Sequence, residues 1–217
     1  RVSKPNQQGD GATVSKVSLA EVETTDKVIA IGSSTGGVKA LKEVIPRLPA
    51  STPGILIAQH MPPGFTTSFA NSLNEISKMD VKEAEDKDRV RNGLVLIAPG
   101  NYHMVLESRG AQNRVRIKSG PRVNNQRPSC DVLFKSVAKE IGMNGIGVIL
   151  TGMGDDGAKG LKKMKEAGAT TVGQDEASCT VYGMPKAAYE MDAVDYQVSL
   201  ESIPSMVLRK VKKTTSS

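Results

Sequence analysis

Short runs of apolar residues recur along the chain and are separated by segments of mixed polarity. Each run is continuous rather than alternating, which is typical of strands that are buried on both faces of a parallel sheet. The sequence therefore predicts strands at Val28–Ile31, Ile55–Ala58, Leu94–Ile97 and Val148–Leu150.

Helices are predicted between these strands, because apolar residues recur there every three or four positions. The first, Gly37–Ile45, is expected to end at Pro46, since proline cannot continue a helix. Ala187–Met191 and Ser202–Val211 are expected to close the fold. The other predicted helices have apolar stripes at Phe65, Phe69, Leu73 and Ile76, at Leu133, Val137 and Ile141, and at Ala158, Leu161, Met164 and Ala167.

Two segments differ from the rest, because polar and apolar residues alternate in them. They are Tyr102–Leu106 and Asn113–Lys118, on either side of Gly110, and they predict an antiparallel hairpin appended to the sheet. Elsewhere strand and helix follow one another. That order predicts an α/β fold, with a doubly wound, mostly parallel sheet, flanking helices and an antiparallel hairpin near one edge.

The beginning of the chain, Arg1–Asp26, is polar without a sustained apolar period, which is typical of a linker. Residues 27–213 are expected to form one domain and residues 214–217 a tail. Because the sequence begins with Arg1 rather than methionine, we expect a fragment whose N-terminal neighbour is missing. The apolar runs are much shorter than the ~20 residues of a membrane helix, so we expect a soluble protein without membrane insertion.

The net charge of +6 is concentrated in two places. Arg109–Cys130 contains six basic residues and no acidic one, Arg209–Lys213 contains four more, and the remainder has 19 basic against 23 acidic residues. A local basic stretch can steer an acidic partner toward a surface. Aromatic residues make up only 3% of the chain and tryptophan is absent, which argues against a nucleic-acid partner bound by stacking.

The chain contains two cysteines, Cys130 and Cys179, and two histidines, His60 and His103. Their spacing does not fit a Cys/His zinc site, so neither a metal nor a cofactor is expected. His103 lies in the predicted hairpin, where packing explains it. His60 directly follows a predicted strand, and histidine is the usual proton shuttle near neutral pH.

Three unusual loops follow predicted strands, at the sheet edge where the sites of doubly wound folds collect. Gly32–Gly37 contains G-x-S-x-G with Ser34 at its centre. Its small residues allow a sharp turn that exposes the serine oxygen beside free backbone N–H groups. The other two loops are Gln59–Gly64, which contains His60, and Thr151–Gly157, which contains Asp155 and Asp156.

Serine, histidine and aspartate on neighbouring loops meet the requirement for acyl transfer, since an imidazole must take the proton of the serine hydroxyl. Of the two acids, we expect Asp155 to cap the following helix, which leaves one carboxylate of the pair to accept the Nδ1 proton of the histidine. Two alternatives remain. Gly32–Gly37 could be the anion cradle of a phosphate- or nucleotide-binding domain, although it lacks the lysine of a P-loop. A non-catalytic regulatory module could bind an acidic partner through its basic surface.

Six motifs follow one another along the chain: Ile29–Gly37, Gln59–Phe65, Ala98–Gly100, Pro128–Phe134, Leu150–Gly157 and Gln174–Cys179. Together they resemble the CheB family, the protein-glutamate methylesterases of bacterial chemotaxis. The resemblance implies that Ser34 is the nucleophile, His60 the base and Asp156 the orienting carboxylate. It also implies that Thr35 and Met153 line the site, and we expect their backbone N–H groups to form the oxyanion hole.

The same resemblance implies a function and partners. The expected reaction is hydrolysis of glutamate γ-methyl esters on the cytoplasmic helices of chemoreceptors, without a cofactor and in the cytoplasm. Deamidation of receptor glutamines is a plausible second activity, because the same chemistry applies to an amide. A phosphorylatable receiver domain is expected before the linker. Since receptor methylation helices are acidic, we expect Arg114 and Arg116 to help dock them.

Overall fold

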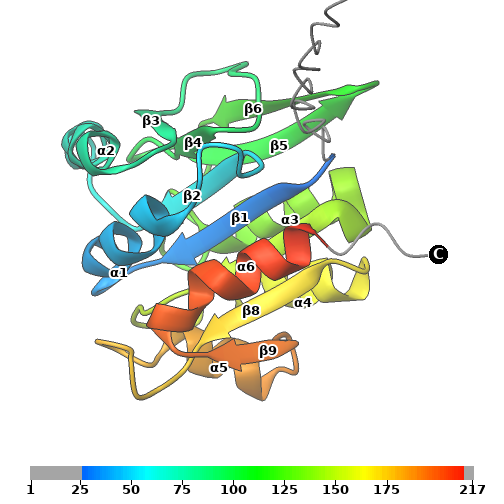
Figure 1. Cartoon of the computed structure of the whole chain (residues 1–217). Helices are drawn as coiled ribbons and strands as arrows, with labels where there is room; N and C mark the ends of the chain where they lie inside the picture. The colour runs from blue at the N-terminus through cyan, green and yellow to red at the C-terminus, as the bar shows by residue number, and fades with distance from the viewer. Residues whose placement is uncertain (1–25, 213–217) are drawn as a thin grey trace, which may run out of the picture.

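A central parallel sheet dominates the computed structural model, which describes residues 26–212 (Figure 1). Its seven strands lie in the order β3-β4-β2-β1-β7-β8-β9, and each neighbouring pair is parallel. The predicted linker, apart from Asp26, and the predicted tail lie outside the described residues. The strands are β1 (Val28–Ser33), β2 (Ile55–Gln59), β3 (Asp80–Glu83), β4 (Leu94–Ile97), β7 (Gly145–Ile149), β8 (Thr170–Gln174) and β9 (Tyr196–Val198).

Helices cover both faces of the sheet, as a doubly wound fold requires (Figure 1). Side chains alternate along β1, so that Ile29 and Ile31 pack toward α1, α2 and α6, whereas Val28 and Ala30 pack toward α3, α4 and α5. The predicted α/β architecture is therefore confirmed. The helices are α1 (Gly37–Val44), α2 (Phe65–Ile76), α3 (Cys130–Ile141), α4 (Ala158–Glu166), α5 (Met184–Glu190) and α6 (Ile203–Val211). No helix among the described residues has the length and apolar character to cross a membrane.

The hairpin consists of β5 (His103–Arg109) and β6 (Gln112–Lys118), and its strands pair antiparallel as predicted. It is not appended to the large sheet, however, but forms a separate two-stranded sheet. Met104, Leu106 and Val115 are buried in the cluster that includes α3. A hydrogen bond of 2.9 Å from Lys87 N to Val115 O joins the hairpin to the loop after the edge strand β3.

Some elements differ from the sequence prediction. Strands β3, β8 and β9 were not predicted, because β3 and β9 are short edge strands and β8 contains buried polar residues. Helix α1 ends at Val44, and Pro46 lies in a short 3-10 turn, Ile45–Arg47. In the predicted α2 stripe, Phe69 and Leu73 are buried but Phe65 and Ile76 are exposed.

Candidate active site

Two of the predicted site residues follow neighbouring strands at the centre of the sheet. Ser33, the last residue of β1, is in register with Gln59, the last residue of β2, and His60 N donates to Ser33 O at 3.1 Å. Ser34 and His60 are the next residues on each strand. Because neighbouring strands lie about 4.8 Å apart, this register brings Ser34 and His60 to adjacent positions at the carboxyl edge.

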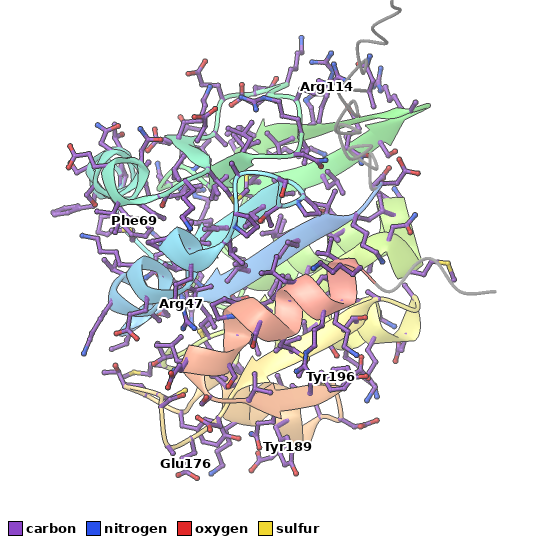
Figure 2. All side chains as sticks on the ribbon, in the orientation of Figure 1. Arg47, Phe69, Arg114, Glu176, Tyr189 and Tyr196 are labelled. Carbon is purple, nitrogen blue, oxygen red and sulfur yellow. The ribbon has the colours of Figure 1, made fainter. Side chains whose placement is uncertain are left out.

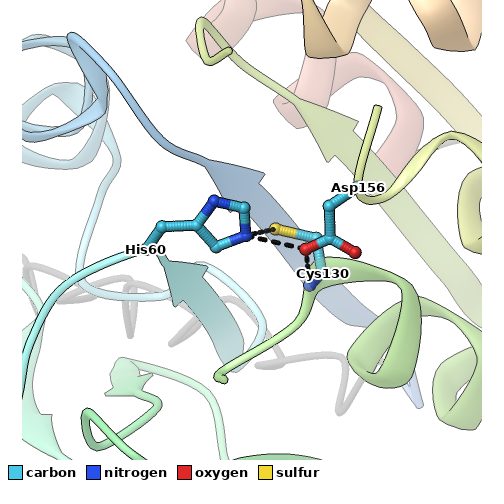
Figure 3. Close-up of side chains that lie close together, drawn as sticks. All are labelled: His60, Cys130 and Asp156. Atoms are coloured by element: carbon cyan, nitrogen blue, oxygen red, sulfur yellow. Dashed lines mark hydrogen bonds and ion pairs between the residues drawn. The ribbon is translucent and has the colours of Figure 1, made fainter. Parts of the chain in front are cut away.

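Asp156 reaches the same edge from the other side of β1. It lies in the loop between β7 and α4, and β7 is the other neighbour of β1. Its Oδ2 lies 2.7 Å from His60 Nε2, and the two side chains are only 3% and 6% exposed (Figure 3). A charge-assisted hydrogen bond in such a water-poor site holds the imidazole in one orientation.

The Asp156 carboxylate also accepts hydrogen bonds from the beginning of α3 and from the loop before it. The donors are Asn124 Nδ2 at 2.8 Å, Ser129 Oγ at 2.7 Å, Cys130 N at 2.7 Å and Asp131 N at 3.2 Å. Burial by itself would raise the pKa of Asp156, but the hydrogen bonds from His60, Asn124, Ser129 and Cys130 lower it to about 2. The carboxylate is therefore ionised at neutral pH.

This ionisation determines which imidazole nitrogen is free. An ionised carboxylate only accepts hydrogen bonds, so His60 Nε2 must donate the proton to Asp156. Our expectation that the carboxylate accepts the Nδ1 proton is wrong for this protein. His60 Nδ1 is buried and has no hydrogen-bond partner among residues 26–212, so a neutral imidazole presents its lone pair there.

The surroundings of the Ser33–Ser34 doublet distinguish its two hydroxyl groups. Ser33 is buried, and its Oγ donates to Gln59 Oε1 at 2.5 Å. Ser34 is partly exposed, and its Oγ makes no hydrogen bond within the described part of the chain. Gln59 Nε2 donates to Ser34 O at 2.9 Å, and Ser34 N donates to Thr151 O at 3.0 Å. The backbone of Ser34 is thus held while its hydroxyl is free.

Two glycines let the backbone pass close to Ser34. Gly36, two residues after Ser34, has a φ of 81°, a left-handed conformation at the N-cap of α1. A Cβ on Gly152 would lie 2.8 Å from Ser34 Cβ, so the loop after β7 packs against the serine. Met153 follows Gly152 and is exposed, as is Thr35, and neither backbone N–H has an acceptor among residues 26–212. Their place in an oxyanion hole stays a prediction.

The other acid of the third loop, Asp155, is exposed, and its side chain makes no hydrogen bond within the described residues. The expectation that it caps the following helix is wrong, since α4 begins after Gly157 without a side-chain cap. A carboxylate from α3 takes this place, because Gly160 N in the first turn of α4 donates to Asp131 Oδ1 at 2.5 Å. Asn124 Nδ2 also donates to Asp131, at 2.7 Å, and so connects the two buried carboxylates.

Sequence reasoning missed several residues around His60. Gln59, Ser129 and Cys130 lie inside motifs quoted for the family resemblance, but nothing in their pattern indicated a role. Cys130 Sγ lies 3.7 Å from His60 Nε2, and burial, followed by the charge of Asp156, raises the pKa of its thiol well above the ordinary value. It is a neutral thiol that donates to Ala58 O at 3.4 Å.

His60, Cys130 and Asp156 are also the only described group of possible metal ligands, with their ligand atoms within 4.8 Å of one another (Figure 3). A metal bound about 2.0–2.2 Å from both nitrogen and oxygen would hold those atoms roughly 3 Å or more apart in tetrahedral geometry. The observed separation of 2.7 Å between Nε2 and Oδ2 fits a shared proton instead. The cluster is better described as a hydrogen-bonded pair with a thiol beside it.

The two arginines predicted to dock a substrate lie on hairpin strand β6, and Figure 2 labels Arg114. Arg116 Nε pairs with Asp86 at 2.9 Å, and Arg114 Nη1 donates to Lys87 O at 2.9 Å. Both bonds attach the hairpin to the loop after β3. A contribution of Arg114 and Arg116 to docking stays a prediction.

Acid should remove the stability that the ionised Asp156 carboxylate provides. Its pKa is lowered from 3.8 to about 2, so this stability is complete above about pH 5 and is lost as the pH falls through 3.8 toward 2. The shift corresponds to roughly 2–3 kcal/mol. In urea unfolding, the difference in unfolding free energy between the native protein and Asp156→Asn is expected to shrink by about 1–2 kcal/mol from pH 5 to pH 2.5. A difference that is equal at both pH values would contradict the assignment.

Comparison with known proteins places this arrangement in a family. Residues 29–207 match the CheB methylesterase family. The chain is 58% identical over 201 residues to protein-glutamate methylesterase/protein-glutamine glutaminase 2 of Syntrophus aciditrophicus, a match that covers 93% of this chain and 58% of that protein. It is 55% identical over 191 residues to protein-glutamate methylesterase/protein-glutamine glutaminase 3 of Shewanella oneidensis, covering 88% and 54%.

A solved structure gives the same result. The crystal structure of the Thermotoga maritima CheB methylesterase catalytic domain matches with a TM-score of 0.82 and 41% identity, over 84% of this chain and 97% of that one. The chain spans little more than half the length of the curated relatives it matches, but almost all of this catalytic domain. The fold, the ordered motifs and these matches agree, and the chain belongs to the CheB methylesterase family.

Proposed function

We propose that the protein is a serine hydrolase that removes methyl groups from glutamate γ-methyl esters of chemoreceptors. The observation that carries the proposal is the 2.7 Å hydrogen bond between Asp156 and His60 Nε2, because it leaves Nδ1 as the free base of an imidazole whose backbone is in register with Ser34. The names of the relatives support the substrate class, since they are protein-glutamate methylesterases.

The reaction has two halves that use the same groups. Ser34 Oγ attacks the ester carbonyl carbon while His60 Nδ1 takes the hydroxyl proton. The backbone N–H groups of Thr35 and Met153 stabilise the tetrahedral oxyanion, and methanol leaves with the proton from His60. Water then loses a proton to Nδ1 and attacks the acyl group. The receptor glutamate leaves as a carboxylic acid that ionises, and the Ser34 hydroxyl is restored.

Glutamine deamidation is the second proposed activity. A glutamine side chain differs from the methyl ester in its leaving group, so the same attack would release ammonia in place of methanol. The relatives are also named protein-glutamine glutaminases, which supports this extension.

The proposal includes the rest of a longer protein. We infer that a receiver domain precedes the chain, since the chain spans 58% and 54% of two relatives. We also infer that the reaction takes place on the cytoplasmic helices of receptors. The alternative function, a phosphate- or nucleotide-binding domain using Gly32–Gly37, is not favoured, because neither relatives nor family have such a name.

The test is methanol release from receptor signalling domains that carry radiolabelled methyl esters. The protein is expected to release labelled methanol in repeated turnovers, with unmethylated receptor as the blank. Calorimetry with nucleotides and inorganic phosphate is expected to show no binding. Phosphate or nucleotide binding without methanol release would overturn the proposal in favour of the anion cradle, and receptor binding without release would favour a regulatory module.

A further inference from the structure

A pocket of about 290 Å³ opens directly beside His60. One wall is the segment His60–Pro63 after β2, and the other consists of Asn101 and of residues from the loop before α3, notably Arg122 and Arg127. No acidic residue of the described part of the chain lines this pocket. Neither arginine has a carboxylate partner among residues 26–212, in contrast to Arg116 of the hairpin, which pairs with Asp86.

The wall that contains the arginines is fixed by hydrogen bonds. Arg127 Nη2 donates to Asn101 Oδ1 at 2.6 Å, Asn101 N donates to Arg127 O at 3.2 Å, and Arg127 Nη1 donates to Gly120 O. Behind it, His103 Nε2 donates to Pro121 O at 2.8 Å, since His103 Nδ1 accepts from Ser129 N. The pocket is therefore formed before any ligand binds.

Two donors of this wall lack good acceptors. Arg127 Nε is buried without a hydrogen-bond partner in the described chain. Arg122 is exposed, and its guanidinium makes a single long hydrogen bond, 3.4 Å from Nη1 to Asn125 O. Buried guanidinium N–H groups almost always find acceptors, and the planar arginine fork matches a carboxylate. The unused donors thus indicate an anion as the ligand.

We propose that this pocket binds a side-chain carboxylate of the substrate protein, one helical turn from the esterified glutamate. This rests on the proposed function. The ester is neutral and offers no charge to the arginines, so the anion must come from another residue. On a helix, side chains three or four positions apart lie about 5–6 Å from each other, which suits a pocket that shares His60 with the reacting centre. Arg122 and Arg127 are therefore specificity-determining residues.

The test uses two helical receptor segments with one γ-methyl glutamate each, identical except for glutamate or glutamine one turn away. The native protein is expected to have an approximately tenfold higher kcat/KM for the glutamate segment. In Arg122→Gln the preference should fall below about twofold, because glutamine has no positive charge to pair with the substrate carboxylate. Its kcat/KM for the glutamine segment should fall much less than for the glutamate segment, because that side chain has no charge to lose a partner. A native melting temperature shows that the variant is folded.

The control is Arg91→Gln, which removes one exposed positive charge at the amino ends of the strands, where Arg91 pairs with Asp80 at 3.3 Å. It is expected to keep the tenfold preference. An equal loss in both variants would assign the preference to net charge and overturn the proposal. Methanol release from both segments without a preference would overturn it while leaving the esterase function intact, whereas no release from either would overturn both.

Discussion

Ser34→Ala is expected to release methanol from methylated receptor about 10⁴- to 10⁶-fold more slowly than the native protein. Two other hydroxyl groups of these loops are already engaged in hydrogen bonds. Ser33 Oγ donates to Gln59 at 2.5 Å, and Thr151 Oγ1 donates to Thr35 O at 2.9 Å while accepting from Val181 N. Binding of the receptor should be unchanged, because the substitution removes only the hydroxyl. The measurement is single-turnover release of labelled methanol together with receptor affinity.

Ser33→Ala is the matched control for this prediction. It removes the neighbouring hydroxyl and one hydrogen bond to Gln59, but the Gln59 amide still donates to Ser34 O at 2.9 Å. We expect its rate to fall less than about tenfold, the effect of one neutral hydrogen bond. A near-native rate in Ser34→Ala with an inactive Ser33→Ala would show that the nucleophile is assigned to the wrong serine.

Much of the sheet was predictable, because a strand that is buried on both faces has a continuous run of apolar residues in its sequence. The runs at Val28–Ile31, Ile55–Ala58 and Val148–Leu150 became, with shifts of a few residues, β1, β2 and β7 at the centre of the sheet. Strand β8, Thr170–Gln174, has no such run. Its buried Thr171 and Gln174 are satisfied by particular partners, Asp195 and Thr151, that only the folded chain provides.

The candidate site was predictable in part for a similar reason. Loops that follow parallel strands meet at one edge, so Ser34, His60 and Asp156 could be expected together once their strands were recognised. Which imidazole nitrogen faces Asp156 could not be predicted, because it depends on the position of the β7–α4 loop relative to the His60 ring. The role of Asn124 could not be predicted either, since its loop has no periodic pattern of apolar residues. Asn124 also lies 32 residues from Asp156 in the sequence.

Asp156→Asn is expected to lower kcat about 10³- to 10⁴-fold while leaving the fold intact. An asparagine presents one oxygen and one NH₂ group where the carboxylate has two acceptors. If the NH₂ group replaced Oδ1, it would face the donors Asn124 Nδ2, Ser129 Oγ and Asp131 N. If it replaced Oδ2, it would face only Cys130 N and His60 Nε2, and the imidazole can adapt.

The second orientation of the amide is therefore favoured, and it changes the tautomer of His60. His60 Nε2 would accept a hydrogen bond from the amide, so the ring proton would move to Nδ1, the nitrogen that must take the Ser34 proton. Nitrogen NMR of labelled imidazole distinguishes the two tautomers, with Nε2–H expected in the native protein and Nδ1–H in Asp156→Asn. Loss of activity with the native tautomer would contradict this explanation, and Asn124→Ala, which removes one donor and leaves the carboxylate, should keep both the tautomer and most of the rate.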